Sequence, residues 1–165
     1  MMANRGVDLL ITYRIVKLMA TPFEKQEAFK FGIIDKNGKV LRKARTLNTE
    51  AEKNSYTILH RFVFNLKRII ARAGLKSSLS SFSVALALIL KENKELIKHK
   101  SLIETTVIQY LKDNNLYEKI LLEDTDIIEN DYDKQKTKPF ITAFGVDVYE
   151  KGNGFVAEDI YAEEL

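Results

Sequence analysis

The spacing of apolar residues along the chain predicts a mainly helical protein. Over residues 7–20 an apolar residue recurs every three to four positions, as expected for one buried helix face: Leu10, Ile11, Ile15, Leu18 and Met19. A similar stripe runs through residues 50–73 and predicts the longest helix. A third helix is expected from Ser80 or Ser81 to about residue 98, and its run at 82–90 is apolar nearly all round. Such a run is typical of a helix buried in the core or at a subunit interface.

Capping sequences indicate where several helices begin. Thr21, Thr49 and Ser101 are each followed three residues later by Glu, which is the spacing of a capping box. These sites predict a short helix after Thr21, the long helix after Thr49 and a fourth helix after Ser101. Gly74 is the expected stop of the long helix.

The stretch FGIIDKNGKVL, residues 31–41, has apolar residues on both sides of a turn sequence. A phosphate-binding loop would lead directly into a helix, but the sequence after Gly38 has no helix cap before Thr49. Asp-Lys-Asn-Gly instead suits a turn with Gly in the left-handed conformation. We therefore expect a β-hairpin at about residues 29–45.

The end of the chain predicts a second hairpin. Residues 140–149 have the composition of a strand, residues 150–154 that of a turn, and residues 155–161 that of a returning strand. The expected fold class is α+β, mainly α: a helical domain with an inserted β-hairpin and a C-terminal β-hairpin tail. The expected boundaries are a basic helical domain at 1–122, an acidic linker at 123–139 and a hairpin arm at 140–165.

The charge is divided unevenly along the chain. Residues 1–100 hold 20 Lys and Arg against 8 Asp and Glu, a net +12, whereas residues 101–165 hold 6 against 15, a net −9. The total is +3. This division favours an acidic partner for the first half and a basic one for the second. Alternatively, the two halves neutralise each other, within one chain or between copies.

Two groups of cations are candidate contacts for an acidic protein or a nucleic acid. The long helix carries a face formed by Arg61, Arg68 and Arg72, with Lys67 beside it, and the predicted hairpin adds Lys39, Arg42, Lys43 and Arg45. Arginine presents a planar set of donors that suits phosphate or carboxylate. Other interpretations of the helix face are solvent exposure, pairing with the acidic half, and a protein partner.

Nothing in the sequence predicts a catalytic, cofactor-binding or metal site. The chain has no Cys, and neither His60 nor His99 has a second ligand at metal-binding spacing. His60 is expected to pack in the long helix. The sequence also lacks the glycine-rich and nucleophile motifs of common enzyme families. We expect a protein that is not an enzyme, binds no small-molecule substrate and does not span a membrane.

Four stretches follow one another along the chain: YRIVKLMATP (13–22), AFKFGIIDKNG (28–38), SYTILHRFVFNLKR (55–68) and SVALALILKE (83–92). In their order they resemble a family of small prohead core or internal virion proteins of T4-like tailed bacteriophages. The resemblance implies a scaffold-core protein of the precursor capsid. It also implies cleavage by an assembly protease after Leu/Ile-x-Glu, for which Glu123 and Glu129 in the acidic linker are the candidates.

These observations predict a non-enzymatic phage structural or assembly protein that acts through charged protein–protein contacts. Its partners would be other copies of itself or other capsid and core proteins, and its place the prohead or virion interior, or the host cytoplasm. One alternative is a nucleic-acid-binding module that contacts DNA through the basic helix face. Another is a small phage regulator that binds a host protein.

Overall fold

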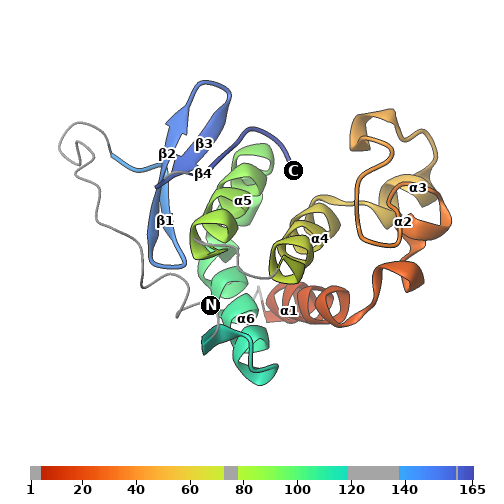
Figure 1. Cartoon of the computed structure of the whole chain (residues 1–165), viewed down its shortest axis with the longest axis horizontal. Helices are drawn as coiled ribbons and strands as arrows, with labels where there is room; N and C mark the ends of the chain where they lie inside the picture. The colour runs from red at the N-terminus through yellow and green to blue at the C-terminus, as the bar shows by residue number, and fades with distance from the viewer. Residues whose placement is uncertain (1–4, 73–77, 119–137, 159) are drawn as a thin grey trace. The chain divides into compact units, whose positions relative to one another are not determined.

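The computed structural model describes residues 5–72, 78–118, 138–158 and 160–165. The chain divides into two compact units, Met1–Ala71 and Arg72–Leu165. The first is drawn from red to yellow in Figure 1 and the second from green to blue. The protein is mainly helical with an antiparallel sheet at its C-terminal end, as the sequence predicts. The boundary differs from the expected one, because it lies after residue 71 and not after residue 122.

The first unit is built from helices joined by a long loop. The helices are α1 (Arg5–Ala20), η2 (Phe23–Lys25), α2 (Glu27–Lys30), η3 (Ala44–Thr46), α3 (Glu50–Ser55) and α4 (Ile58–Ala71). α1 packs against α4. The core includes Phe64 of α4, whose ring lies 5.7 Å from Phe23 and 6.0 Å from Tyr56 between centroids. Replacing such a buried Phe by Ala usually costs about 3–5 kcal/mol.

The helix predicted over residues 50–73 is two helices. Thr49 forms the expected capping box with Glu52, but the helix that it opens ends at Ser55. α4 then begins behind Thr57, whose carbonyl accepts the N–H of Arg61 at 3.0 Å. The Nδ1 atom of His60 accepts the N–H of Thr57 at 3.2 Å. A histidine thus takes the place that Glu occupies in the usual capping box, which is why the sequence pattern did not reveal this second start.

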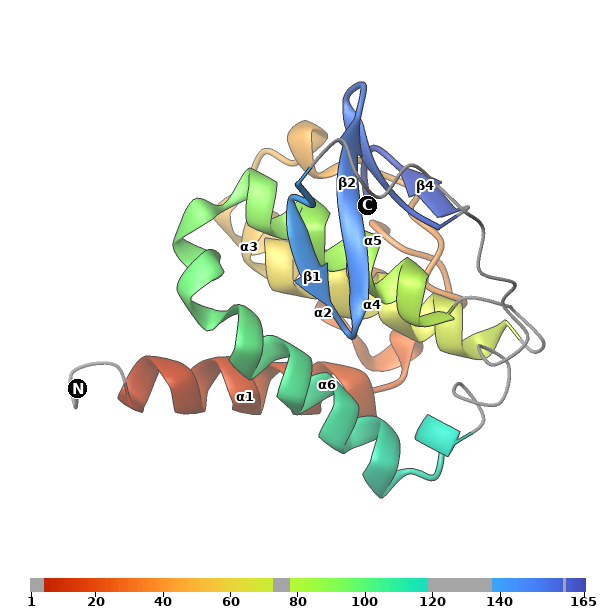
Figure 2. The ribbon, with the colours of Figure 1, turned by 90° about the vertical axis from the view of Figure 1, so that its left-hand side faces the viewer.

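The second unit places one helix against a four-stranded sheet. It contains α5 (Ser78–Glu92), η4 (Lys94–His99) and α6 (Lys100–Asp113), followed by β1 (Ile141–Ala143), β2 (Val146–Lys151), β3 (Gly154–Ala157) and β4 (Ile160–Ala162). The strands are antiparallel in the order β1-β2-β3-β4. Figure 2 shows them lying across α5. The predicted apolar helix is therefore a core helix, with Val84 and Ala87 packed against Val148 and Phe155.

The strand predicted over residues 140–149 is a hairpin of its own. Phe144 and Gly145 both have positive φ, +53° and +76°, and form the tight turn between β1 and β2. The Phe144 ring packs edge to face on Phe82, and the Glu104 carboxylate of α6 accepts the Phe144 N–H at 3.2 Å. Glu104 also pairs with Lys100. The capping box predicted at Ser101 is absent, since α6 begins at Lys100 and Glu104 anchors this turn.

The helix predicted to continue to residue 98 ends at Glu92. Asn93 follows, and its side chain accepts the N–H of Glu95 at 3.1 Å, which starts the separate helix η4. At the other end of the chain, the short helix expected after Thr21 begins at Phe23 without a side-chain cap. The Thr21 hydroxyl donates instead to the Lys17 carbonyl at 2.6 Å.

Candidate functional site

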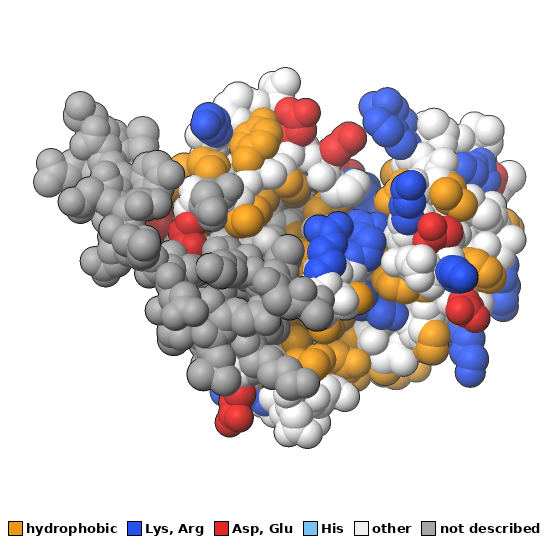
Figure 3. Space-filling view, viewed as in Figure 1, with side chains coloured by type: hydrophobic (Ala, Val, Ile, Leu, Met, Phe, Trp, Pro, Cys, Tyr) orange, Lys and Arg blue, Asp and Glu red, His pale blue; other side chains and the backbone are white. Residues whose placement is uncertain are grey.

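The two units have net charges of opposite sign. Residues 1–71 carry 14 Lys and Arg against 6 Asp and Glu, a net charge of +8. Residues 72–165 carry 12 against 17, a net charge of −5. Lys and Arg side chains are prominent on the face of the first unit that Figure 3 shows. The candidate site is therefore an electrostatic surface, and the basic unit is its natural starting point.

The predicted turn is present at residues 35–38, and backbone hydrogen bonds join its two arms without forming extended strands. The Asp35 carboxylate accepts the N–H groups of Asn37 at 2.8 Å and Lys39 at 2.9 Å, and Gly38 takes φ +80°. The bond from Lys39 is the main reason that the pKa of Asp35 lies below its ordinary value. Beyond the turn, the N–H of Leu41 donates to the Ile33 carbonyl at 2.8 Å and that of Asp35 to the Lys39 carbonyl at 3.0 Å, and Ile34 and Val40 form an isolated antiparallel bridge. The expected hairpin is thus a short one, set in a longer loop.

Arg68 holds this loop against α4. One of its nitrogens donates to the Gly38 carbonyl at 2.6 Å and the other to Asn65 Oδ1 at 3.1 Å. The Phe23 ring lies directly over the Gly38 Cα. The charge of Arg68, predicted as a partner contact, is therefore used to position the turn.

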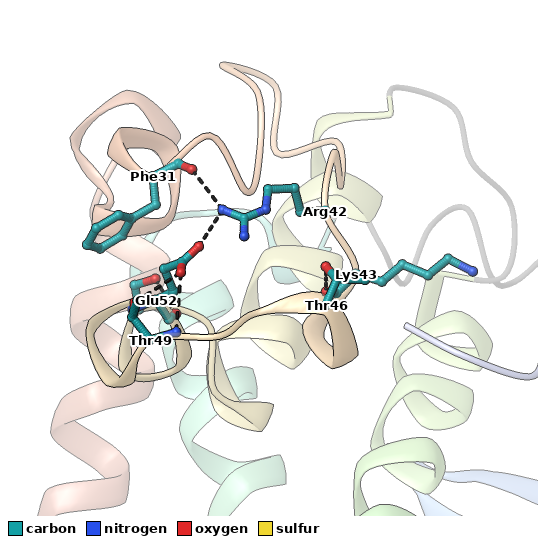
Figure 4. A network of polar contacts seen from close by, with 7 residues as sticks. Phe31, Arg42, Lys43, Thr46, Thr49 and Glu52 are labelled. Atoms are coloured by element: carbon teal, nitrogen blue, oxygen red, sulfur yellow. Dashed lines mark hydrogen bonds and ion pairs between the residues drawn. The ribbon is translucent and has the colours of Figure 1, made fainter.

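Arg42 is also engaged within the fold, as Figure 4 shows. Its guanidinium forms an ion pair with Glu52 and donates to the Phe31 carbonyl at 3.4 Å. Glu52 is the same residue that completes the capping box with Thr49. Hydrogen bonds from Thr49, followed by Arg42, lower the pKa of the Glu52 carboxyl. This network ties the exit of the loop to the start of α3.

Lys67 caps the C-terminal end of α1. Its half-buried ammonium donates to the carbonyls of Thr21 and Leu18, the latter at 3.3 Å, and lies 4.4 Å from the Phe23 ring centroid. Gln26 donates to the same two carbonyls. A cation at a helix C-terminus satisfies the last carbonyls and the helix dipole. Burial lowers the pKa of Lys67. The sequence offered no signal for this role, because the partners lie 46 and 49 residues away.

The remaining predicted contacts lie mostly at the surface. Lys39, Lys43 and Arg45 are exposed on the loop, together with Lys36. Lys43 points away from the Arg42–Glu52 pair in Figure 4. Arg61 is half-buried on α4, and Arg72 is exposed just beyond its end. The loop cations, more than the helix face, form the candidate contact surface.

Both histidines lie in the part of the chain that the structure describes, and neither belongs there to a group of side chains that could hold a metal ion. Within the described residues, no three His, Asp or Glu side chains are arranged to hold a metal ion. His60 packs edge to face on Phe64 at 5.7 Å between centroids and serves the start of α4. Burial, with a smaller contribution from the Arg14 charge, lowers the pKa of His60 to about 4. Its imidazole is therefore neutral near pH 7, as its acceptor role at Nδ1 requires.

Three predictions fall partly or wholly outside the described ranges. One is Gly74 as the stop of the long helix, which lies in the segment 73–77. Glu123 and Glu129, the candidate cleavage sites, both lie in the segment 119–137, as does most of the acidic linker predicted at 123–139.

Among the helices that the structure describes, none combines the length and the apolar character needed to cross a bilayer.

Comparison with known proteins found no match for this chain. Neither protein-family models nor curated protein sequences nor solved structures match the chain. The case for function accordingly rests on the two charged units and the exposed loop of the first.

Proposed function

We propose that the protein is a non-catalytic assembly component whose copies associate through their oppositely charged units. In this arrangement the basic first unit of one copy meets the acidic second unit of the next. The observation that carries the proposal is that the two units have net charges of opposite sign, +8 for residues 1–71 and −5 for residues 72–165. Complementary fields of this kind steer association and select orientation.

The resemblance of residues 13–92 to prohead core and internal virion proteins supports a setting for this association. We propose that the protein is packed in the scaffold core of a T4-like phage prohead or inside the virion. There it would contact copies of itself or other capsid and core proteins. Dense packing suits contacts that form through many weak charge pairs, each worth about 1 kcal/mol or less at a surface.

DNA binding is the second candidate, favoured by the exposed cations of the loop. The predicted Arg face of α4 supports it less, since Lys67 and Arg68 donate to backbone carbonyls of the same unit. If DNA is the partner, affinity for a duplex should fall steeply with salt as counterions are released. Titration of a labelled duplex into the full chain at low salt checks this.

Sedimentation velocity of the full chain tests the assembly proposal. At about 0.01 M salt the screening length is about 30 Å, and at about 1 M it is about 3 Å. We expect concentration-dependent association in the first condition and monomers in the second. Monomers at low salt and high protein concentration would overturn the proposal, and association that salt strengthens would point to apolar contacts instead.

A further inference from the structure

The face of the sheet turned away from α5 carries a row of aromatic and apolar side chains. Tyr149, Val156 and Tyr161 are register partners on β2, β3 and β4. Side chains alternate between faces along a strand, so this row lies opposite Val148 and Phe155, which pack on α5. Tyr161 is 47% exposed, and Tyr149 and Val156 are partly exposed. The row forms a partly exposed strip across three strands.

Carboxylates border this strip, and one cation, Lys151, lies on the same side of β2 two residues after Tyr149. Asp147 lies two residues before Tyr149 on the same side of β2, and Glu163 lies two residues after Tyr161 and accepts its hydroxyl hydrogen at 3.2 Å. The whole segment 138–165 holds 2 Lys against 6 Asp and Glu, a net charge of −4. We name Asp147, Tyr149, Val156, Tyr161 and Glu163 the tyrosine face. Such a surface suits a cationic partner, because Tyr rings attract ammonium and guanidinium groups.

The loop of the first unit has the complementary character. Residues 36–45, here named the basic loop, contain five Lys and Arg and no Asp or Glu. Leu41 in the middle of the loop is 58% exposed, which gives the cations an apolar neighbour. An apolar centre with a charged border is the usual anatomy of a protein interface.

We propose that the tyrosine face of one copy binds the basic loop of a second copy. Leu41 would lie on the strip of Tyr149, Val156 and Tyr161, with loop cations beside Asp147 and Glu163. The inference rests on the proposed function and names the surfaces through which it operates. Because the two surfaces differ, the contact is heterologous, and its repetition builds a ring if the rotation between copies closes or an open filament if it does not.

Three full-chain variants test the contact. The loop variant is Lys39→Glu with Arg45→Glu, and the sheet variant is Tyr149→Thr with Tyr161→Thr. The control, Lys25→Glu with Lys53→Glu, makes the same charge change at exposed positions outside the basic loop. Sedimentation at low salt should show association weakened about tenfold or more in the loop and sheet variants. The control should retain more of the wild-type association, and circular dichroism verifies that each variant is folded.

A mixture of the loop variant and the sheet variant gives the decisive result. A loop variant keeps an intact tyrosine face and a sheet variant keeps an intact basic loop, so an equimolar mixture should recover association but stop at dimers. Wild-type association by the sheet variant, or a mixture that stays monomeric, would overturn the inference and leave the proposed function standing. A wild-type chain that fails to associate at low salt would instead overturn the proposed function.

Discussion

At the level of single residues, a basic face on a helix does not reveal what its cations meet. Arg42, Lys67 and Arg68 all belong to the predicted contact set, yet each donates to a backbone carbonyl of the first unit. Periodicity placed Lys67 and Arg68 on a helix, where the structure has them in α4, because periodicity depends on local geometry alone. The partners of these cations are carbonyls 11 to 49 residues away in sequence. Only the tertiary fold brings them together.

His60 predicts a dependence of stability on pH. Its pKa is about 4 in the fold and about 6.5 in an unfolded chain, so between these values the unfolded state binds the extra proton. The contribution of His60 to the free energy of unfolding is therefore fully present above about pH 6.5. It falls by up to about 3 kcal/mol as the pH drops towards 4. Urea unfolding at a series of pH values measures the loss.

The matched variant for this test is His60→Gln, which keeps an acceptor for the Thr57 N–H but cannot titrate. The wild type should lose more stability than the variant between pH 6.5 and 4, because carboxylates such as Asp35 and Glu52 titrate in both. Parallel stability curves for the two proteins would show that His60 does not contribute.

Gly38 and Gly32 provide a matched pair for backbone strain. Both have positive φ, +80° and +70°, but a Cβ at Gly38 would lie 2.4 Å from the Phe23 ring whereas one at Gly32 meets nothing within 4 Å. Gly32→Ala should cost about 1 kcal/mol of unfolding free energy from strain alone. Gly38→Ala adds the clash and should cost about 2–4 kcal/mol. Equal costs in chemical denaturation would contradict the packing of Phe23 over the turn.

At the level of helices and strands, the existence of elements was predictable and their ends were less so. α1 matches a helix predicted from apolar spacing, because that spacing reports a buried face, and α5 matches one predicted from an apolar run. α6 matches the helix predicted from the capping sequence at Ser101, although that box does not form. Of the three capping boxes, the one at Thr49 is real, while Thr21 bonds to Lys17 and Glu104 to the β1–β2 turn. Tertiary contacts compete for the same side chains, and sequence spacing does not register that competition.

The end of α1 offers a test of whether Lys67 is structural. Lys67→Met removes the donor to the carbonyls of Leu18 and Thr21 while keeping the length of the side chain. We expect a loss of about 1–2 kcal/mol in unfolding free energy, since the last carbonyls lose a charged donor. Arg72→Met, an exposed site beyond α4, should change stability by less than about 0.5 kcal/mol. If Lys67→Met leaves the free energy of unfolding unchanged, we would infer that Lys67 serves to bind a partner instead.

At the level of the whole molecule, composition reported the charge division but not the point where packing separates the units. The sequence shows a basic first part and an acidic last part, whichever residue is taken as the border. The border after residue 71 depends on which helices share a core. The predicted C-terminal hairpin is likewise part of a larger sheet, because α5 supplies an apolar surface that all four strands cover.

The central claim, that the basic unit of one copy meets the acidic unit of another, is tested most directly by zero-length crosslinking. A carbodiimide joins a Lys amine to a carboxylate that it contacts, and mixing copies of normal and heavy nitrogen separates links between chains from links within one. At low salt we predict mixed-isotope peptides that join Lys36, Lys39 or Lys43 to Asp147 or Glu163. The account would be contradicted if no mixed-isotope links form. It would also be contradicted if such links never join the first unit of one copy to the second unit of another.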